Sequence, residues 1–487
     1  MKKSRHNGAS LGSAISMKFA ERLGTQIVNV VLNMVMARLL YPEAFGTVAI
    51  INVFVVLAQC ISQNGISSAI VQKKEEDGAD YSTGLVLGLG LAAALYAIIF
   101  VAAPWIGVFY NNPALAVYLR VLSLVLFPGA LNTVYNAINM RKMQFKPIMI
   151  SGILSSITSC LLGVVCAYFG AGIWALIIQQ GANILLQTGI LAILTKWKLS
   201  LRFSKSSAKS LFGYGNRIVI AGIIDNLYYD AENLFIGKAM SQTMLGFFTN
   251  ARNYPLRVIS SVKDTIANVI FPAMAKEKGD TEKIRGIARH SLQLFTFLVF
   301  PVMFGMALVA REFTISLLTE KWELSIIPMQ YFCISLSVLA ISSPNVQVVK
   351  ALGLSQLVLH IEIMRKGAMF AALGIVLLLA PSINNVALGS MVATVLMALV
   401  VAQICGSKIG YGVLRQLWDI RRNLMAVVVM VVVLLAKEAF LPLENRMLLD
   451  MLLKVALGGV SYFGAALLTR NEILWEFLGK MLKRKAC

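Results

Sequence analysis

The chain has 487 residues, of which 58% are hydrophobic and 14% are charged, and its mean hydropathy is +0.75. A water-soluble protein needs more polar side chains than this to cover its surface, so the composition excludes a soluble globular protein and indicates one embedded in a bilayer. The 44 lysines and arginines against 23 acidic residues would favour nucleic-acid binding only on a soluble surface, so their placement along the chain has to be considered.

Apolar segments long enough to cross a membrane recur along the whole chain. A spanning helix needs about 20 mainly apolar residues, and the short polar links leave no room for a separate globular domain. Long apolar runs such as residues 424–436 lack period-two alternation, which argues against a barrel. We predict an all-α integral membrane fold of about fourteen helices, over residues 13–36, 44–63, 83–107, 116–138, 148–168, 172–194, 213–237, 246–271, 290–310, 325–348, 357–380, 384–405, 423–441 and 449–469.

The basic residues predict the topology of this bundle. When the links are numbered alternately, one set holds thirty lysines and arginines and the other set holds six. Short cytoplasmic links carry the basic excess in membrane proteins, so both termini are predicted to lie in the cytoplasm. The excess is therefore a topology signal and an attraction to anionic lipid headgroups, and no nucleic-acid partner is expected.

An internal repeat appears at an offset of 200 residues. The pattern Asn33, Ala37, Arg38 and Gly46 recurs as Asn233, Gly237, Lys238 and Gly246. This offset pairs the first predicted span with the seventh, as expected for two six-helix lobes related by a pseudo-two-fold axis along the membrane normal. We predict an N-terminal lobe over residues 1–200, a second lobe over residues 201–420, and an additional helix pair with a cytoplasmic tail over residues 421–487.

Polar residues form stripes on three of the predicted spans. A charged residue inside a span costs about 2.5 to 3.5 kcal/mol, so such residues generally face a bundle interior or a water-filled cavity. The stripes contain Lys18, Arg22, Gln26, Asn29 and Asn33 on span one; Arg217, Asp225, Asn226, Asp230, Glu232 and Asn233 on span seven; and Asn250, Asn253, Arg257, Ser261, Asp264 and Asn268 on span eight.

We interpret the stripes as the lining of a hydrated cavity that attracts an anion. Its cationic groups would be Lys18, Arg22, Arg217, Arg252, Arg257 and Lys263, and its polar lining Gln26, Asn29, Asn33, Asn226, Asn233, Asn253 and Asn268. The alternative is that these groups pair with one another, as Lys263 with Asp264, and only fasten helices together. Neither a nucleophile with its base nor a metal-ligand spacing of cysteine and histidine occurs, so we expect no enzyme and no metal cofactor.

Three stretches resemble the polysaccharide transporter family, the Wzx-type flippases of the multidrug/oligosaccharidyl-lipid/polysaccharide exporter superfamily, and especially its colanic-acid-exporter-like branch. They are MARLLYPEAFGTVAI (Met36–Ile50), YYDAENLFIGKAMSQTMLGFFTNARNYP (Tyr228–Pro255) and IANVIFPAMAKEK (Ile266–Lys278). The resemblance extends over most of the chain and is strongest up to about residue 280, whereas spans thirteen and fourteen look generic.

The resemblance implies a two-lobed bundle in the bacterial cytoplasmic membrane that works by alternating access. Its cargo would be an undecaprenyl-pyrophosphate-linked oligosaccharide repeat unit, and the expected state is a monomer, with a polysaccharide polymerase complex as a candidate partner. Members are often coupled to H⁺ or Na⁺, for which the candidates are Asp225, Asp230 and Glu232, with Glu21 and Asp264 as further acidic groups. A lipid II-type flippase, a drug or cation antiporter of the same superfamily, and a scaffold protein are the alternatives.

Overall fold

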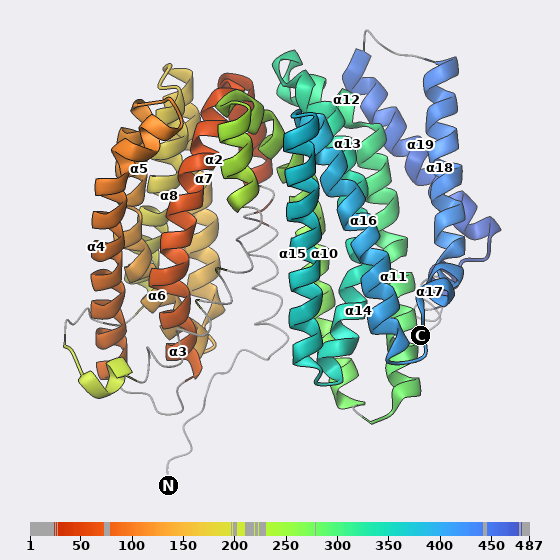
Figure 1. The fold of residues 1–487 in the computed structure, drawn as a ribbon, viewed down its shortest axis with the longest axis horizontal. Coiled ribbons are helices and arrows are strands. Elements are labelled where there is room, and N and C mark those ends of the chain that lie inside the picture. The colour runs from red at the N-terminus through yellow and green to blue at the C-terminus, as the bar shows by residue number, and fades with distance from the viewer. Residues whose placement is uncertain are drawn as a thin grey trace. The chain divides into compact units, whose positions relative to one another are not determined.

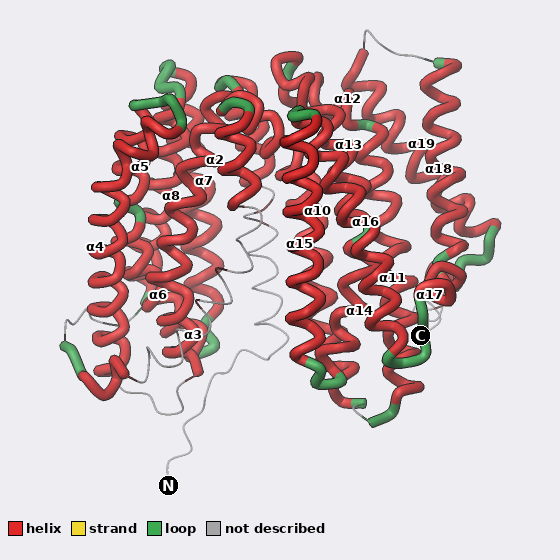
Figure 2. The backbone as a smooth tube through the Cα atoms, in the orientation of Figure 1, coloured by secondary structure: helices red, strands yellow, loops and turns green. Residues whose placement is uncertain are grey.

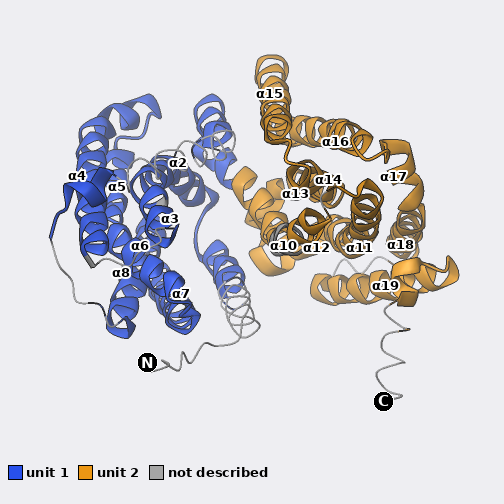
Figure 3. Ribbon diagram, turned by 90° about the horizontal axis from the view of Figure 1, so that it is seen from below, with its two compact units in different colours: residues 1–246 blue, residues 247–487 orange. Residues whose placement is uncertain are grey.

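In the computed structural model, the described residues are 24, 26, 28–72, 78–195, 197, 202–209, 219, 223, 230–277, 279–441, 446–476 and 479, and the side chains of 64, 78 and 261–269 are not described. Within these ranges the backbone is helical and contains no strand, as Figure 2 shows. The chain forms two compact units, residues 1–246 and 247–487 (Figure 3). The predicted all-α fold is confirmed for the described residues.

The first unit is a bundle of membrane-length helices (Figure 1). A break at Leu124 and Val125 divides one span into α5 and α6, and a turn of π-helix, η1, lies between α2 and α3. The elements are a helix at Val28–Leu39, α2 (Pro42–Gln59), η1 (Cys60–Asn64), α3 (Gly65–Gln72), α4 (Gly78–Phe109), α5 (Ala114–Ser123), α6 (Leu126–Arg141), α7 (Phe145–Tyr168), α8 (Ile173–Leu194), a helix over residues 230–239, and the first turn of α10 (Gln242–Lys276).

Small residues allow α7 and α8 to pack closely in this unit. The buried face of α7 carries serines and glycines, and a Cβ on Gly163 would lie 2.9 Å from the Cβ of Gln179 on α8. Without a strong hydrophobic force between helices in lipid, such close backbone approach provides much of the packing energy. The turn between the two helices uses Gly170 and Gly172 in left-handed conformations, at φ +80° and +56°.

The second unit is built around α11. Figure 3 shows α11 among α14, α18 and α19, and its aromatic residues form the core, where the hydroxyl of Tyr462 donates to the carbonyl of Phe297 at 2.8 Å. The elements are α10, α11 (Thr281–Leu308), α12 (Ala310–Phe313), η2 (Thr314–Leu318), η3 (Glu320–Ser325), α13 (Ile326–Ser337), α14 (Leu339–Ala351), α15 (Ser355–Leu379), α16 (Ile383–Ser407), α17 (Val413–Asp419), α18 (Arg421–Phe440) and α19 (Met447–Leu468).

Ten helices of the described chain are long and apolar enough to cross a membrane, and they coincide with ten of the predicted spans. The eighth and eleventh predicted spans are α10 and α15, which are long helices but carry charged residues along their length, such as Arg257 in α10 and Arg365 in α15. The first and seventh predicted spans lie largely outside the described residues. The predicted spans eight and eleven are therefore present as the helices α10 and α15.

Candidate functional site

The helix at residues 28–39 carries two of the predicted cavity residues, Asn29 and Asn33. The Asn33 amide donates to the backbone oxygen of Asn29, and the Asn29 side-chain oxygen lies 3.9 Å from the Cys160 sulfur on α7. The Gln179 amide on α8 donates to the same sulfur at 3.1 Å. Asn29 thus belongs to a polar seam inside the first unit. The third residue of this stripe in the described chain, Gln26, is half-buried.

The helix over residues 230–239 carries three further predicted residues. Glu232 is buried, with 1% of its surface exposed, and Asp230 and Asn233 are half-buried. The backbone of this helix is held at Leu234, whose carbonyl accepts a hydrogen bond from the Tyr110 hydroxyl at 3.2 Å. Acidic groups so placed in a membrane protein commonly have a functional role, which keeps Asp230 and Glu232 as candidates for ion coupling.

In the second unit, α10 carries the predicted polar stripe of span eight. Asn250 and Arg252 are buried, Arg257 is half-buried and Asn253 is exposed. The Arg252 guanidinium lies 5.7 Å from the centre of the Phe248 ring, one turn earlier on the same helix. A membrane-length helix that buries cationic and amide side chains is far more polar than its neighbours, as a substrate-facing helix would be.

The remaining predicted residues lie outside the described part of the chain. For Lys263, Asp264 and Asn268 only the helical backbone of α10 is described. Neither backbone nor side chain is described for Lys18, Glu21, Arg22, Arg217, Asp225 and Asn226. The cationic cavity and the coupling carboxylates therefore stay predictions.

Two glycines 200 residues apart make reciprocal contacts within the first unit. A Cβ on Gly46 would lie 1.7 Å from the backbone oxygen of Gln242, and a Cβ on Gly246 would lie 1.9 Å from that of Pro42. Because Pro42 and Gln242 are themselves 200 residues apart, each segment contacts the other with equivalent residues, as at a two-fold axis. This crossing of α2 with the first turn of α10 agrees with the repeat offset read from the sequence, and the division into two six-helix lobes stays a prediction.

A polar clamp surrounds the glycine crossing. The Gln242 side-chain oxygen accepts hydrogen bonds from the Thr47 hydroxyl and from the Asn112 amide, both at 2.8 Å. Beside the clamp is a cavity of about 530 Å³, lined among others by Glu43, Tyr110, Asn112, Lys238 and Gln242. The sequence stripes did not include the clamp residues, because they lie at helix ends, and the repeat at Gly46 and Gly246 was the only signal near them.

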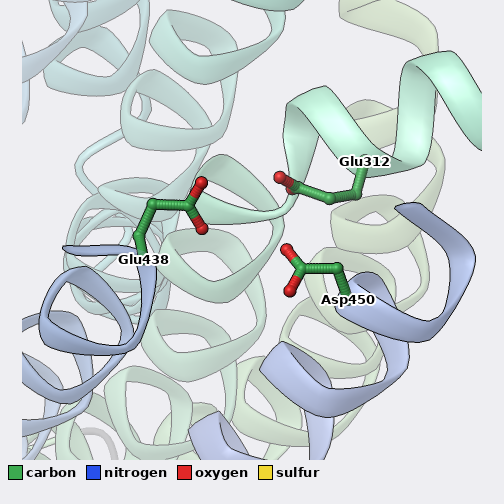
Figure 4. Close-up of side chains that lie close together, drawn as sticks. All are labelled: Glu312, Glu438 and Asp450. Carbon is green, nitrogen blue, oxygen red and sulfur yellow. The ribbon is translucent and has the colours of Figure 1, made fainter. Parts of the chain in front are cut away.

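A second polar cluster, in the second unit, is formed by three carboxylates and two lysines at one end of α12, α18 and α19. Figure 4 shows the carboxyl groups of Glu312, Glu438 and Asp450 directed toward one another. The Lys454 ammonium lies 2.9 Å from Glu312, 2.6 Å from Glu438 and 3.4 Å from Asp450. Lys437 contacts Asp450 and lies 3.8 Å from Glu438. We call these five residues the ion network.

The charged groups of the ion network pair with one another. Its three carboxylate oxygens lie within 4.8 Å of one another, a spacing that a metal ion could bridge. The Lys454 ammonium contacts all three carboxylates, however, and Lys437 adds a second positive charge. The side chains of Glu312, Asp450 and Lys454 are 5 to 6% exposed, so the pairs of Lys454 with Glu312 and Asp450 are shielded from water, whereas the Glu438 side chain is 48% exposed. The arrangement fits a fastening of α18 and α19 to α12.

Sequence reasoning missed the ion network because its members come from distant segments. Glu312 and Lys454 are separated by 142 residues. The available signal was a carboxylate and a lysine at i and i+4, Asp450 and Lys454, inside an otherwise apolar span. Such a pair on one helix face inside the membrane requires further partners or water.

Comparison with known proteins adds to this geometry. The family model described as polysaccharide biosynthesis protein matches residues 35–327, which is more than half of the chain. The chain belongs to this family. The match includes α2 to α8, α10, α11 and the crossing of Gly46 with Gly246, and it ends at the start of α13, before the helices that hold Glu438 and Lys454. The ion network therefore lies largely outside the family match.

Curated relatives of this family member are named for the biosynthesis of lipopolysaccharide, succinoglycan and teichuronic acid, and one of them is named as a transport protein. Lipopolysaccharide biosynthesis protein WzxC of Escherichia coli (strain K12) is 26% identical over 62% of this chain and 61% of its own length. Succinoglycan biosynthesis transport protein ExoT of Rhizobium meliloti (strain 1021) is 22% identical over 71% and 70%. Teichuronic acid biosynthesis protein TuaB of Bacillus subtilis (strain 168) is 22% identical over 63% and 64%. The chain thus matches from three fifths to seven tenths of these relatives.

Solved structures confirm the fold of this family member. The lipid II flippase MurJ in an inward closed conformation aligns with a TM-score of 0.72 over 94% of this chain and all of that chain, at 12% identity. A multidrug resistance MATE family transporter of the MOP superfamily in an outward-facing conformation aligns with a TM-score of 0.57 over 82% and 96%, at 16% identity. The chain therefore has the all-helical membrane fold of these transporters.

Proposed function

We propose that this protein is a flippase that translocates an undecaprenyl-pyrophosphate-linked oligosaccharide repeat unit across the cytoplasmic membrane for surface polysaccharide biosynthesis. The observation that carries the proposal is the family match over residues 35–327. The relatives named for lipopolysaccharide, succinoglycan transport and teichuronic acid differ in glycan, which supports a shared transport step rather than one sugar. The transporter fold and the polar helix α10 agree with this role.

The mechanism follows from the physical problem posed by the cargo. A sugar pyrophosphate cannot enter hydrocarbon because its charged and hydroxyl groups would lose their hydrogen bonds to water. Cationic side chains such as Arg252 and Arg257 on α10 would replace that hydration with charge-assisted hydrogen bonds, which are strong where water is excluded. The polyprenyl chain would stay in lipid, and alternating access would expose the headgroup first on one side and then on the other.

The proposal includes the orientation of the protein in the membrane and the energy source for transport. Both termini would lie in the cytoplasm, because basic residues concentrate in links such as 141–146 and 276–289. Coupling to H⁺ or Na⁺ would involve acidic residues within the spans, of which Asp230 and Glu232 are described. The protein would act as a transporter without catalysing a chemical step.

Gene deletion followed by mass spectrometry of the lipid extract tests the proposal. A complete lipid-linked repeat unit should accumulate inside the cell while the surface polysaccharide disappears, and the intact gene should reverse both changes. Loss of the polysaccharide without accumulation would place the protein at another step. An unchanged polysaccharide together with an unchanged lipid extract would refute the proposal.

A lipid II-type flippase for the cell-wall precursor is the second candidate. It is favoured by the similarity to MurJ over 94% of the chain. Both cargoes carry a pyrophosphate on a polyprenol, so the cationic groups would serve either one. Rescue of a strain depleted of its lipid II flippase decides between them: growth after expression of this chain favours lipid II, whereas lysis in cells that contain the protein favours the polysaccharide precursor.

A further inference from the structure

The link between α16 and α18 contains a short helix with two unlike faces. Leu414 and Trp418, one turn apart on α17, are 80% and 65% exposed, whereas Gln416 on the opposite face is 1% exposed. The Gln416 side chain exchanges hydrogen bonds with Asn345 of α14, at 2.8 and 2.9 Å. The amphipathic helix is therefore held to the bundle by its polar residue and presents its apolar residues outward.

Ionic contacts fix α17 at one end of the second unit. The Arg285 Nε on α11 donates to the Ile409 carbonyl at 2.7 Å, and Arg289, also on α11, pairs with Asp419 at 3.0 Å. The Tyr411 hydroxyl donates to the other Asp419 oxygen at 2.8 Å. These contacts place α17 where α11 begins, which is the end that the topology prediction assigns to the cytoplasm. The outward face of α17 is thus part of a rigid surface.

The cations of this surface exceed its available anions. Asp419 is already paired with Arg289, and Glu472 with Arg422 at 2.9 Å. Lys408, Arg415 and Arg421 have no carboxylate partner among the described residues. The Arg415 guanidinium donates to the Gly410 carbonyl at 3.0 Å, and the Arg421 guanidinium lies 4.1 Å from the centre of the Trp418 ring. Arg421 therefore lies against the exposed Trp418, Arg415 is next to the exposed Leu414 in the sequence of α17, and Lys408 follows α16 in the link that leads to α17.

This combination has the chemistry of a membrane interface. Tryptophan and leucine insert at the boundary between headgroups and acyl chains, and nearby cations gain energy when the headgroups are anionic. A guanidinium offers several donors to a phosphodiester, and Arg421 is already held in place against the indole. A zwitterionic headgroup would satisfy the apolar contact but would leave the three charges without a net counter-charge.

We propose that Lys408, Leu414, Arg415, Trp418 and Arg421 form a binding site for an anionic phospholipid, the α17 surface. The phosphodiester is held by the three cations while Leu414 and Trp418 insert beside its acyl chains. The site does not include Arg252 and Arg257 of α10, which the proposed function assigns to the cargo. The proposal does not depend on which lipid-linked sugar the protein carries, and it fixes the end of the second unit at which α16 and α18 meet the membrane surface.

Fluorescence quenching by brominated lipids tests the α17 surface on the purified full chain in nanodiscs. The discs contain phosphatidylcholine with an equal fraction of either brominated phosphatidylglycerol or brominated phosphatidylcholine. The signal of Trp418 is obtained as the difference between the natural chain and a W418F variant. Brominated phosphatidylglycerol should quench Trp418 at least about twofold more than brominated phosphatidylcholine, because local enrichment follows the charge attraction.

Charge variants make the test specific. Replacement of Lys408, Arg415 and Arg421 by Gln should reduce the phosphatidylglycerol quenching to the phosphatidylcholine level, while K350Q, at the exposed end of α14, should leave it unchanged. Equal quenching by both lipids in the natural chain would overturn the headgroup preference. Absence of quenching by either lipid would show that the surface does not lie in the bilayer, as expected if it contacts a protein instead. Circular dichroism of each variant shows that the helices are retained.

Discussion

At single positions, residues of the same type have very different surroundings in the structure. Gly46 and Gly90 are both glycines in apolar helices, yet a Cβ would meet a backbone oxygen at Gly46 and open space at Gly90. Likewise Lys454 and Lys283 both pair with carboxylates, but the Lys454 side chain is 5% exposed and that of Lys283 is 64% exposed. Surroundings rather than residue type therefore decide which substitutions the protein tolerates.

The substitution G46A should destabilise the protein. The added Cβ would meet the Gln242 carbonyl at 1.7 Å, which forces α2 and α10 apart, and such overpacking costs about 1 to 3 kcal/mol. Thermal melting of the purified protein in detergent measures the loss. G90A, where nothing lies within 4 Å, is the matched control and should melt like the natural protein. Equal melting of G46A and G90A would contradict the close crossing.

The substitution K454M should destabilise the second unit strongly. It leaves the buried carboxylates of Glu312 and Asp450 without their shared cation, and loss of one partner from a buried ion network costs about 3 to 5 kcal/mol. Thermal melting again provides the measurement, and K283M, which removes two exposed pairs, should have little effect. Adding E312Q to K454M should recover part of the loss because it removes one uncompensated charge. A double variant less stable than K454M would refute this account.

At the level of the helices, residues at helix ends and breaks say more about the structure than the apolar helix centres do. The break between α5 and α6 at Leu124 and Val125 lies just before Pro128, which has no backbone N–H to donate to the Leu124 carbonyl. The start of α11 shows the same local control, because Asp280 caps the helix by accepting a hydrogen bond from the Lys283 backbone at 3.0 Å. Local sequence thus decides where helices begin and bend.

The cap of α11 should depend on pH. The Lys283 backbone N–H holds the pKa of Asp280 below its ordinary value of 3.8. A lowered pKa in the folded chain means that the cap is fully effective above the ordinary value and weakens as the pH falls through the lowered one. Hydrogen exchange of the amides in residues 281–285, corrected for the intrinsic rate, should accelerate on acidification in the natural chain. In D280A these amides should exchange quickly at both pH values. Equal protection of the amides in the natural chain and in D280A would contradict the role of the cap.

For the molecule as a whole, polar α10 and the repeat-related glycine crossing distinguish this chain from a passive bundle of apolar helices. Its family membership and all-helical membrane fold agree with the proposed transport of an anionic cargo. Arg252 and Arg257, the predicted cavity cations of α10 whose side chains are described, are the positions at which the cationic-cavity hypothesis can be tested without disturbing the α2 crossing.

The substitution R257A should reduce transport while the protein remains in the membrane. Loss of one charge-assisted hydrogen bond, worth about 1.5 to 3 kcal/mol, corresponds to at least about a tenfold lower rate. Surface polysaccharide in a deletion strain, normalised to membrane abundance of the variant, measures the change. R257K keeps the charge and should retain part of the activity, and K350Q, at the end of α14, should transport normally. Normal export by R257A would remove the support for a cationic role of α10.

The sequence by itself determined the membrane embedding, the positions of the long helices and the repeat at an offset of 200, because hydropathy, charge bias and periodicity are properties of short segments. The same reasoning identified α10 as a polar span and selected Asn29, whose side chain lies against α7. Only the tertiary structure brought Lys454 to Glu312 across 142 residues and Asn112 to Gln242 across 130 residues. Such pairs depend on how helices pack, and an isolated segment contains no signal for a partner that lies far away in the chain.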